Sequence, residues 1–348
     1  MTTLTSPQLG IWGEQLLRPD DPCFNIGGYL RIPCALDISR LRLALRLTLD
    51  QCDAFGCGLS VSPQGEPIQT AAPPTKLEQV DLSSTDNPES EAESWMHRRI
   101  AEPIPFDGTS LLRCSVLKAA PDLNFIFLAA HHIAVDGWGM SLLVQTLAAN
   151  YNGETPPVTT PYQSFADADA AYLKSDAFDG DADYWTSRFT SPHDQLLPNL
   201  AIDRGSGSIS RRRSFSISRE CFRELEVLGQ RAGGSAMQVV LAAIHCCLSR
   251  LHRRHTIVFG VPVLNRGTPA QRRVVGMCTS VLPLVVDGRR RRFDELARAL
   301  ALDLRQAYRH RRFTAHGLSR RLGLNAPVYQ ALFSYERHDY CVKFDSTP

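Results

Sequence analysis

The chain has 348 residues, of which 43% are hydrophobic and 21% charged, and its formal net charge is +2. This composition is that of a folded protein and excludes a disordered chain. No run approaches the eighteen apolar residues that a membrane-spanning helix needs, and the opening MTTLTSPQLGIW has no basic segment followed by an apolar core. We therefore expect a cytoplasmic protein that binds no membrane.

The charge is divided unevenly along the chain. Residues 1–190 hold 12 basic and 24 acidic side chains, whereas residues 191–348 hold 26 basic and 12 acidic ones. This asymmetry predicts two units, the second inclined toward anionic partners. The arginine runs at 211–213 and 289–292 have no aromatic interleaving, so we expect no nucleic acid as partner.

Ten cysteines are scattered along the chain without a C-x-x-C pair. A zinc site or a secreted disulfide framework would need closer, paired spacing. We therefore predict buried reduced thiols and no metal.

The first half begins with an amphipathic helix over 36–49, with Asp37 as its N-cap. A hairpin follows within 53–70, and a helix starts near Pro88 with acids in its first turn. Two strands, 111–118 and 125–130, precede helices over 138–151 and around 165–174.

Residues 191–212 are predicted as the crossover to the second half. Beyond it we expect helices near 218–230, 235–252 and 293–311, and strands near 256–263, 280–286 and 329–335. Ser235, in AGGSAM, precedes a helical pattern and is predicted as an N-cap rather than as a carrier-type attachment serine.

The stretch LAAHHIAVDGWGM (128–140) joins a predicted strand to a predicted helix. Neighbours on a strand face opposite sides, so the pair predicts one working histidine and one structural histidine. Asp136 would be costly to bury unpaired and should meet a cation. The N–H of Gly137, at a helix start, suits a developing oxyanion. A structural histidine pair with a turn Asp-Gly stays open as the alternative.

These residues carry a resemblance. His131-His132-Ile-Ala-Val-Asp136-Gly137 is similar to the signature of the condensation domains of nonribosomal peptide synthetases, which share the chloramphenicol acetyltransferase-like fold. Three further stretches resemble that family's motifs in order along the chain: TSPQLGIW (5–12), PYQSFADADAAYLKSDAFDGDADYW (161–185) and GVPVLNRGTPAQRRVVGMCTSVLPL (260–284).

The resemblance implies an α/β protein of two acetyltransferase-like lobes, each a mixed sheet with helices, in a V-shaped pseudo-dimer. The lobes would span 1–178, which carries the motif, and 179–348. The family continues beyond the equivalent of FSYERHDYCVKFDSTP, so the second lobe is expected to be incomplete by about a fifth of the fold. The family's R-H-E-x-L-R-T-x-F segment corresponds to DQCDAFGCGL (50–59), which keeps neither arginine and leaves the local packing open.

The resemblance also implies the roles of the site residues. His132 faces a tunnel between the lobes as the central catalytic residue, and His131 is structural. Asp136 pairs with Arg266 from the other lobe, and Gly137 is our candidate for holding the oxyanion. Trp138 and Ser280 are expected to line the tunnel.

The implied reaction is acyl transfer: a thioester-bound acyl or aminoacyl group joins the amine of a carrier-bound amino acid. Substrates would arrive on the phosphopantetheine of donor and acceptor carrier proteins, beside an adenylation domain, with no intrinsic cofactor. PCFNIGGYL, AYLKSDAF and PVLNR resemble most the initiating subtype, whose acyl donor can come from coenzyme A. Two alternatives stay open: a non-catalytic module that binds carriers, and a free-standing coenzyme A-dependent acyltransferase acting on a soluble amine or alcohol.

Overall fold

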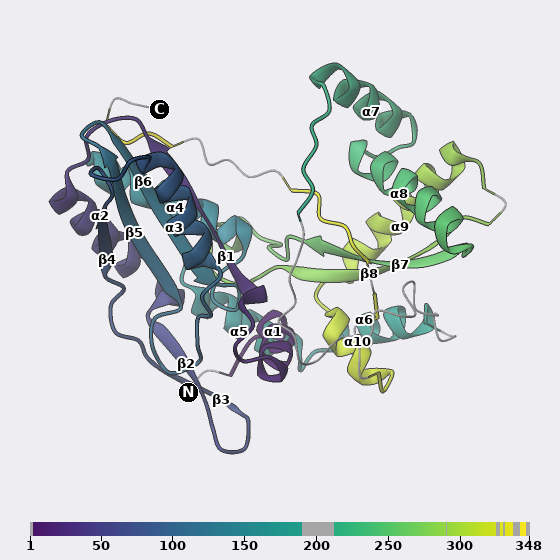
Figure 1. The fold of residues 1–348 in the computed structure, drawn as a ribbon. Coiled ribbons are helices and arrows are strands. Elements are labelled where there is room, and N and C mark those ends of the chain that lie inside the picture. Colours follow the sequence, from purple (N-terminus) through teal and green to yellow (C-terminus); the bar gives the residue numbers. More distant parts are fainter. Residues whose placement is uncertain are drawn as a thin grey trace. The chain divides into compact units, whose positions relative to one another are not determined.

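The computed structural model describes residues 3–189, 212–289, 291–324, 328–329, 331–336 and 342–345. These residues form two compact units (Figure 1). Unit 1 comprises 3–171, 266–278 and 342–345, and unit 2 comprises the rest. The predicted lobe boundary at 178/179 stays a prediction; in the structure, 266–278 group with unit 1, because their backbone and side chains bond to its first half.

Unit 1 is built on a four-stranded sheet in the order β1-β6-β5-β4. Its strands are β1 (Asn25–Ile32), β4 (Leu77–Asp81), β5 (Leu112–Ala120) and β6 (Leu123–His131). β6 runs antiparallel to both neighbours, and β4 is parallel to β5. A separate hairpin pairs β2 (Cys57–Val61) with β3 (Pro67–Ala71), as predicted.

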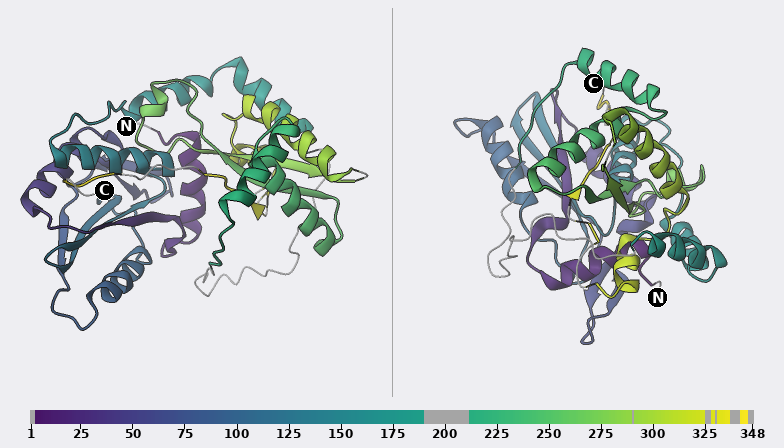
Figure 2. Two further views of the ribbon diagram at one scale, coloured as in Figure 1. Left: turned by 90° about the horizontal axis from the view of Figure 1, so that it is seen from above. Right: turned by 90° about the vertical axis from the view of Figure 1, so that its right-hand side faces the viewer.

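The central strand β6 is buried on both faces. Ile126, Leu128 and Ala130 belong to the large core with α2 (Ile38–Asp50) and α4 (Gly137–Asn152). Phe125 and Phe127 belong to the smaller core under α3 (Pro88–Ile100). Alternate residues therefore serve opposite faces, which explains the unbroken apolar run FIFLAA. Figure 2 shows the sheet of unit 1 with helices on either side.

Two further α-helices and three short 3-10 helices lie in the described part of unit 1. They are α1 (Ser6–Leu17), α5 (Tyr162–Tyr172) and the short 3-10 helices η1 (Pro22–Phe24), η2 (Asp53–Phe55) and η3 (Gln271–Arg273). The predicted N-cap Asp37 is confirmed, because its carboxylate accepts the N–H of Arg40 at 3.0 Å. Residues 342–345 also join this unit, where the buried ring of Phe344 contacts Tyr151.

Unit 2 has a three-stranded sheet in the order β8-β7-β9. Its strands are β7 (Thr256–Val263), β8 (Ser280–Asp287) and β9 (Ala331–Leu332); its helices are α6 (Asp176–Ser187), α7 (Arg219–Arg231), α8 (Ala236–His252), α9 (Phe293–Arg309) and α10 (Ala315–Arg321). Ser235 precedes α8, and its N–H bonds to the side chain of Gln238, which confirms the N-cap prediction. The predicted crossover at 191–212 lies outside the described residues except for its last residue, Arg212.

Candidate functional site

The two histidines lie at the connection between strand β6 and helix α4 of unit 1. His131 is the last residue of β6, and α4 begins at Gly137. Asp136 is the N-cap of α4: its Oδ1 accepts the N–H of Gly139 at 2.8 Å. The predicted strand-to-helix connection is therefore confirmed.

His131 is buried, with 1% of its surface exposed. Its Nδ1 accepts the N–H of Ile133 at 3.2 Å, and its Nε2 lies 3.0 Å from Oε1 of Gln15. The rings of Phe106 and Phe24 lie beside it, with centroids at 4.9 and 6.1 Å. Burial, and secondarily the adjacent His132, lower the pKa of His131 to about 3. This ring is neutral at physiological pH, as a structural histidine should be.

His132 has a different environment. It is half-buried, and its backbone N–H donates to the carbonyl of Phe24 at 2.7 Å. Its Nδ1 is buried and has no hydrogen-bond partner among the described residues. No carboxylate within the described part of the chain orients this imidazole, unlike the histidine of a catalytic triad. His132 is thus the less constrained ring of the pair.

Asp136 and Arg266 form a buried bidentate ion pair. Nη1 and Nη2 of Arg266 lie 2.6 and 2.9 Å from the two carboxylate oxygens, and each residue is 1% exposed. The N–H of Cys278 donates to Oδ2 of Asp136 at 3.0 Å. Burial alone would raise the pKa of Asp136, but the guanidinium and these hydrogen bonds hold it below the ordinary value. Arg266 is therefore the cation that we expected beside a buried Asp136. We expected it to come from the other lobe, but it belongs to the same compact unit as Asp136.

Residues 266–278 are fastened to the loop at several further points. Arg266 donates to the carbonyls of Val274 and Gly276, and the carbonyl of Gly276 also accepts the N–H of Asp136. Nε1 of Trp138 donates to the carbonyl of Arg272 at 2.8 Å. This segment and the start of α4 therefore form one hydrogen-bonded body within unit 1.

The other predicted site residues are placed as follows. Gly137 is the first residue of α4, and both it and Trp138 are half-buried. Ser280 begins β8 in unit 2; it is buried, and its hydroxyl has no hydrogen-bond partner among the described residues. The roles of Gly137, Trp138 and Ser280 stay predictions.

Two buried glutamines of α1 were not predicted as site residues. Gln8 donates from Nε2 to the carbonyl of Ile133 at 2.9 Å, and Gln15 meets His131. They are seven residues apart, which is two helical turns, so they share the buried face of α1 with Ile11 and Trp12. Polar residues on a buried helix face are the sequence signal that would have found them.

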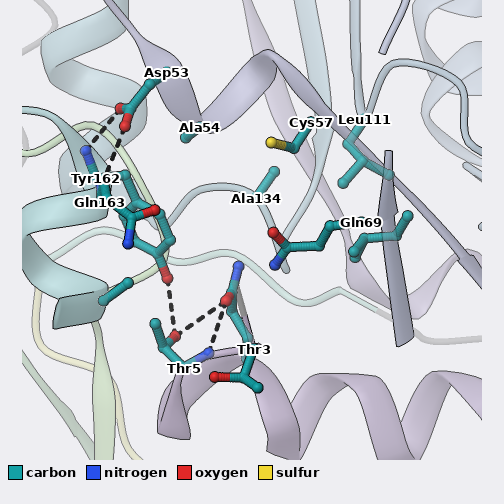
Figure 3. Close-up of a pocket in the computed structure, with 13 residues that line it drawn as sticks. Thr3, Thr5, Asp53, Ala54, Cys57, Gln69, Leu111, Ala134, Tyr162 and Gln163 are labelled. Atoms are coloured by element: carbon teal, nitrogen blue, oxygen red, sulfur yellow. Dashed lines mark hydrogen bonds between the residues drawn. The ribbon is translucent and has the colours of Figure 1, made fainter. Parts of the chain in front are cut away.

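A small pocket lies in unit 1 beside this loop (Figure 3). Its volume is about 70 Å³, and its lining residues are Thr3, Thr5, Gln8, Asp53, Ala54, Cys57, Leu59, Gln69, Leu111, Ala134, Tyr162, Gln163 and Ala166. Ala134 comes from the histidine loop, but His132 is not among the lining residues. Such a volume suits a few water molecules rather than a substrate.

The stretch 50–59, which lacks the family's arginines, is well packed. The carboxylate of Asp53 accepts the N–H groups of Tyr162 and Gln163 at 2.7 and 3.1 Å, and so caps the start of α5. Phe55 and Leu59 are buried in the core of unit 1. Local packing here is therefore maintained by a carboxylate on a helix N-terminus.

The cysteines only partly follow the prediction. All nine described cysteines are free thiols, and Cys52, Cys114 and Cys278 are buried. The prediction that the thiols are buried is wrong for four of them, because they lie at exposed positions of helices and of a hairpin: Cys23, Cys57, Cys221 and Cys247. Within the described ranges, no three potential ligands from His, Cys, Asp and Glu come together as a metal site.

No single helix of the described chain is long and apolar enough to cross a membrane. Taken together, α7 and α8 are long and apolar enough, but the pair is bent by 94°, and length and composition are the only features that suggest a span.

Comparisons with known proteins identify the family. The family model of the condensation domain matches residues 1–346. The dimodular nonribosomal peptide synthase of Bacillus subtilis (strain 168) is 27% identical over 331 residues. The match covers 92% of this chain and 14% of that protein, so this chain spans a small part of the relative's length.

Two solved structures are similar over nearly the whole chain. The first condensation domain of the CDA synthetase has a TM-score of 0.82 and 26% identity, over 99% of this chain and 84% of that one. A mutant starter condensation domain of rhizomide synthetase RzmA, in complex with C8-CoA and Leu-SNAC, has a TM-score of 0.85 and 24% identity, over 97% and 78%. The second likeness concerns the fold alone.

Proposed function

Because this chain belongs to the condensation-domain family, whose members are acyltransferases that form amide bonds, we propose that it joins a thioester-bound acyl or aminoacyl group to the amine of a carrier-bound amino acid. The amine nitrogen attacks the thioester carbonyl carbon. The carbon–nitrogen bond forms, the carbon–sulfur bond breaks, and the amine proton ends on the departing thiol. The amino group of the acceptor must therefore be held in line with the carbonyl.

The observation that carries this proposal is the contrast between the two histidines. His131 is fixed on both ring nitrogens, whereas His132 has a buried Nδ1 without a partner among the described residues. A free amine needs only modest help from a base, and among the described residues no carboxylate orients His132 to act as a strong base. We assign to His132 the role of holding the attacking amine by a hydrogen bond and passing on its proton.

The rest of the loop supports that role. The Asp136–Arg266 pair fixes the start of α4, where the backbone N–H of Gly137 is our candidate for holding the oxyanion of the tetrahedral intermediate. Trp138, fastened to Arg272, and Ser280 are proposed to line the passage for the substrates. These assignments follow the family motif onto this chain residue by residue.

Partners and location belong to the same proposal. The substrates would arrive on the phosphopantetheine arms of donor and acceptor carrier proteins beside an adenylation domain, and no intrinsic cofactor is needed. The RzmA starter domain was solved with C8-CoA, which supports coenzyme A as an alternative source of the donor. The nine cysteines that the structure describes are free thiols, which supports a reducing compartment such as the cytoplasm.

The test is a product assay with matched donors and acceptors. The chain is incubated with one acyl group on a carrier or on coenzyme A, and with one amino acid on a carrier or as a soluble thioester. Mass spectrometry then detects the amide. We expect product on the carrier-bound acceptor. Product only from acyl-coenzyme A and a soluble amine or alcohol would identify a free-standing acyltransferase. Carrier binding without product would identify a non-catalytic module.

A further inference from the structure

Gln15 of α1 is a buried polar residue whose side chain hydrogen-bonds to His131, the first histidine of the pair. We propose that Gln15 is a positioning residue for acyl transfer: it accepts the Nε2 proton of His131, which supports one tautomer of that ring, and it ties the turn after α1 to the strand end that carries His132. This inference rests on the proposed function, in which His132 contacts the reacting groups.

Both polar groups of the Gln15 carboxamide make hydrogen bonds. Its Nε2 lies 2.6 Å from the carbonyl oxygen of Arg18, 3.2 Å from that of Asp21 and 3.3 Å from that of Pro19. Its Oε1 faces Nε2 of His131 at 3.0 Å. The side chain is only 4% exposed. One residue thus closes the turn 18–21 and touches the histidine ring.

The hydrogen bonds leave one assignment for the protons. The N–H of Ile133 can only donate, so Nδ1 of His131 must accept and its proton must sit on Nε2. The amide of Gln15 must point its NH₂ group at the three carbonyls, and its oxygen therefore receives the Nε2 proton of His131. Loss of the Gln15 amide removes the acceptor that favours this tautomer.

The effect reaches His132 through the backbone. The turn that Gln15 closes leads into η1, whose last residue, Phe24, accepts the N–H of His132 at 2.7 Å. The next residue, Asn25, pairs with His131 in the sheet. A turn that shifts would therefore move the carbonyl that holds His132 in register with its neighbour.

The surroundings of His131 make the link to Gln15 specific. The ring lies beside Phe24 and Phe106, and Trp12 stacks on Phe106 at 4.9 Å. Among the described residues, Gln15 is the side chain that hydrogen-bonds to this imidazole. After burial, the neighbour that lowers the pKa of the His131 ring, as far as the described chain shows, is His132. An apolar substitute at position 15 leaves the Nε2 proton buried without an acceptor.

The test compares Gln15→Met with wild type, because methionine keeps the length and packing and removes the amide. We expect kcat to fall by about tenfold to a hundredfold while KM changes less than about twofold, as for other residues that orient a working group. The ¹⁵N shift of Nε2 of His131 should change because its proton loses the acceptor, while Nδ1 still accepts the N–H of Ile133. Thr48→Val, a buried hydroxyl loss on α2, is the matched control and should leave both readouts unchanged.

A double-mutant cycle locates the effect. On a His131→Phe background, Gln15→Met should lower kcat by less than it does in wild type, because the route through the ring is gone and only the route through the turn 18–21 remains. An equal loss on both backgrounds would overturn the proposal, as would a wild-type kcat in Gln15→Met. If Gln15→Met does not fold, the wild-type spectrum decides: an Nδ1–H tautomer of His131 contradicts the assignment.

Failure of the proposed function is distinguishable from failure of this inference. If His132→Ala retains full turnover, the proposed function is wrong, and the ¹⁵N shifts alone still judge the link between Gln15 and His131. If His132→Ala is inactive and Gln15→Met is fully active with an unchanged His131 spectrum, the proposed function stands and Gln15 has no positioning role.

Discussion

Removing the carboxylate of Asp136 should be among the most damaging single changes in unit 1. In Asp136→Ala the guanidinium of Arg266, 1% exposed, keeps its charge and loses both carboxylate oxygens. The carbonyls of Val274 and Gly276 stay in contact with it but cannot neutralise it. The N–H groups of Gly139 and Cys278 also lose their acceptor.

The magnitude follows from these contacts. Breaking one side of a buried ion pair costs about 3–5 kcal/mol, because the remaining charge is stranded. Loss of an N-cap adds about 1 kcal/mol. We therefore expect the free energy of unfolding to fall by about 4–6 kcal/mol, a large share of the roughly 5–15 kcal/mol of an ordinary domain.

The assay is urea unfolding followed by tryptophan fluorescence, since Trp12, Trp95 and Trp138 all lie in unit 1. The matched variant is Asp136→Ala combined with Arg266→Met, which removes the stranded charge. We expect the double variant to be more stable than Asp136→Ala alone, since apolar replacement of a whole buried pair is often neutral. A loss below about 1 kcal/mol in Asp136→Ala, or a double variant as unstable as the sum of the singles, would refute the reasoning.

Three further outcomes follow from the structure. The pKa of His131 in the folded chain is lowered to about 3. As the pH falls below about 6.5, this histidine therefore takes up a proton in the unfolded chain but not in the folded one, which favours unfolding. The free energy of unfolding should drop by about 2 kcal/mol between pH 7.5 and 5, and His131→Phe should abolish that drop in urea titrations. Phe344→Ala should cost about 3–5 kcal/mol of unfolding free energy, whereas Leu17→Ala, at an exposed site, should stay within about 0.5 kcal/mol; equal effects would contradict the burial of Phe344. Gly276→Ala would put a Cβ 2.1 Å from the ring of Tyr162, so a melting temperature equal to wild type would rule out this close contact.

Much of the architecture was predictable because its signals are local. The apolar run of β6 and the Asp-Gly pair gave the strand-to-helix connection, and Asp37 gave the start of α2. The acetyltransferase-like α/β fold, implied by ordered motifs, is confirmed by the likeness to solved condensation domains. Features that depend on residues close together in the sequence could therefore be predicted from it.

Elements that depend on distant partners were missed. β1 was not predicted because its two glycines weaken a strand, yet Gly27 is needed where a Cβ would lie 2.2 Å from the carbonyl oxygen of Leu128. α6 carries Gly180 in its interior, and β4 is short. Tertiary packing decides these elements, and local propensity does not report it.

The sequence supplied the candidate site residues, whose roles stay predictions, but not the residues that support them. The motif led to Asp136 and Arg266, and their hydrogen bonds match that pairing. Gln15 contacts the ring of His131, 116 residues away, and the carboxylate of Asp53 accepts the N–H groups of Tyr162 and Gln163, 109 and 110 residues away. The sequence can show polar residues on a buried helix face, but it gives no spacing pattern that names their distant partners.

The most direct measurement is single-turnover amide formation by His132→Ala with a loaded donor and a loaded acceptor. Our account predicts a rate lower by about a hundredfold or more, with circular dichroism and melting temperature as in wild type, because this half-buried ring takes no part in the buried hydrogen-bond network of its neighbour. A folded His132→Ala protein that makes the amide at the wild-type rate would contradict it.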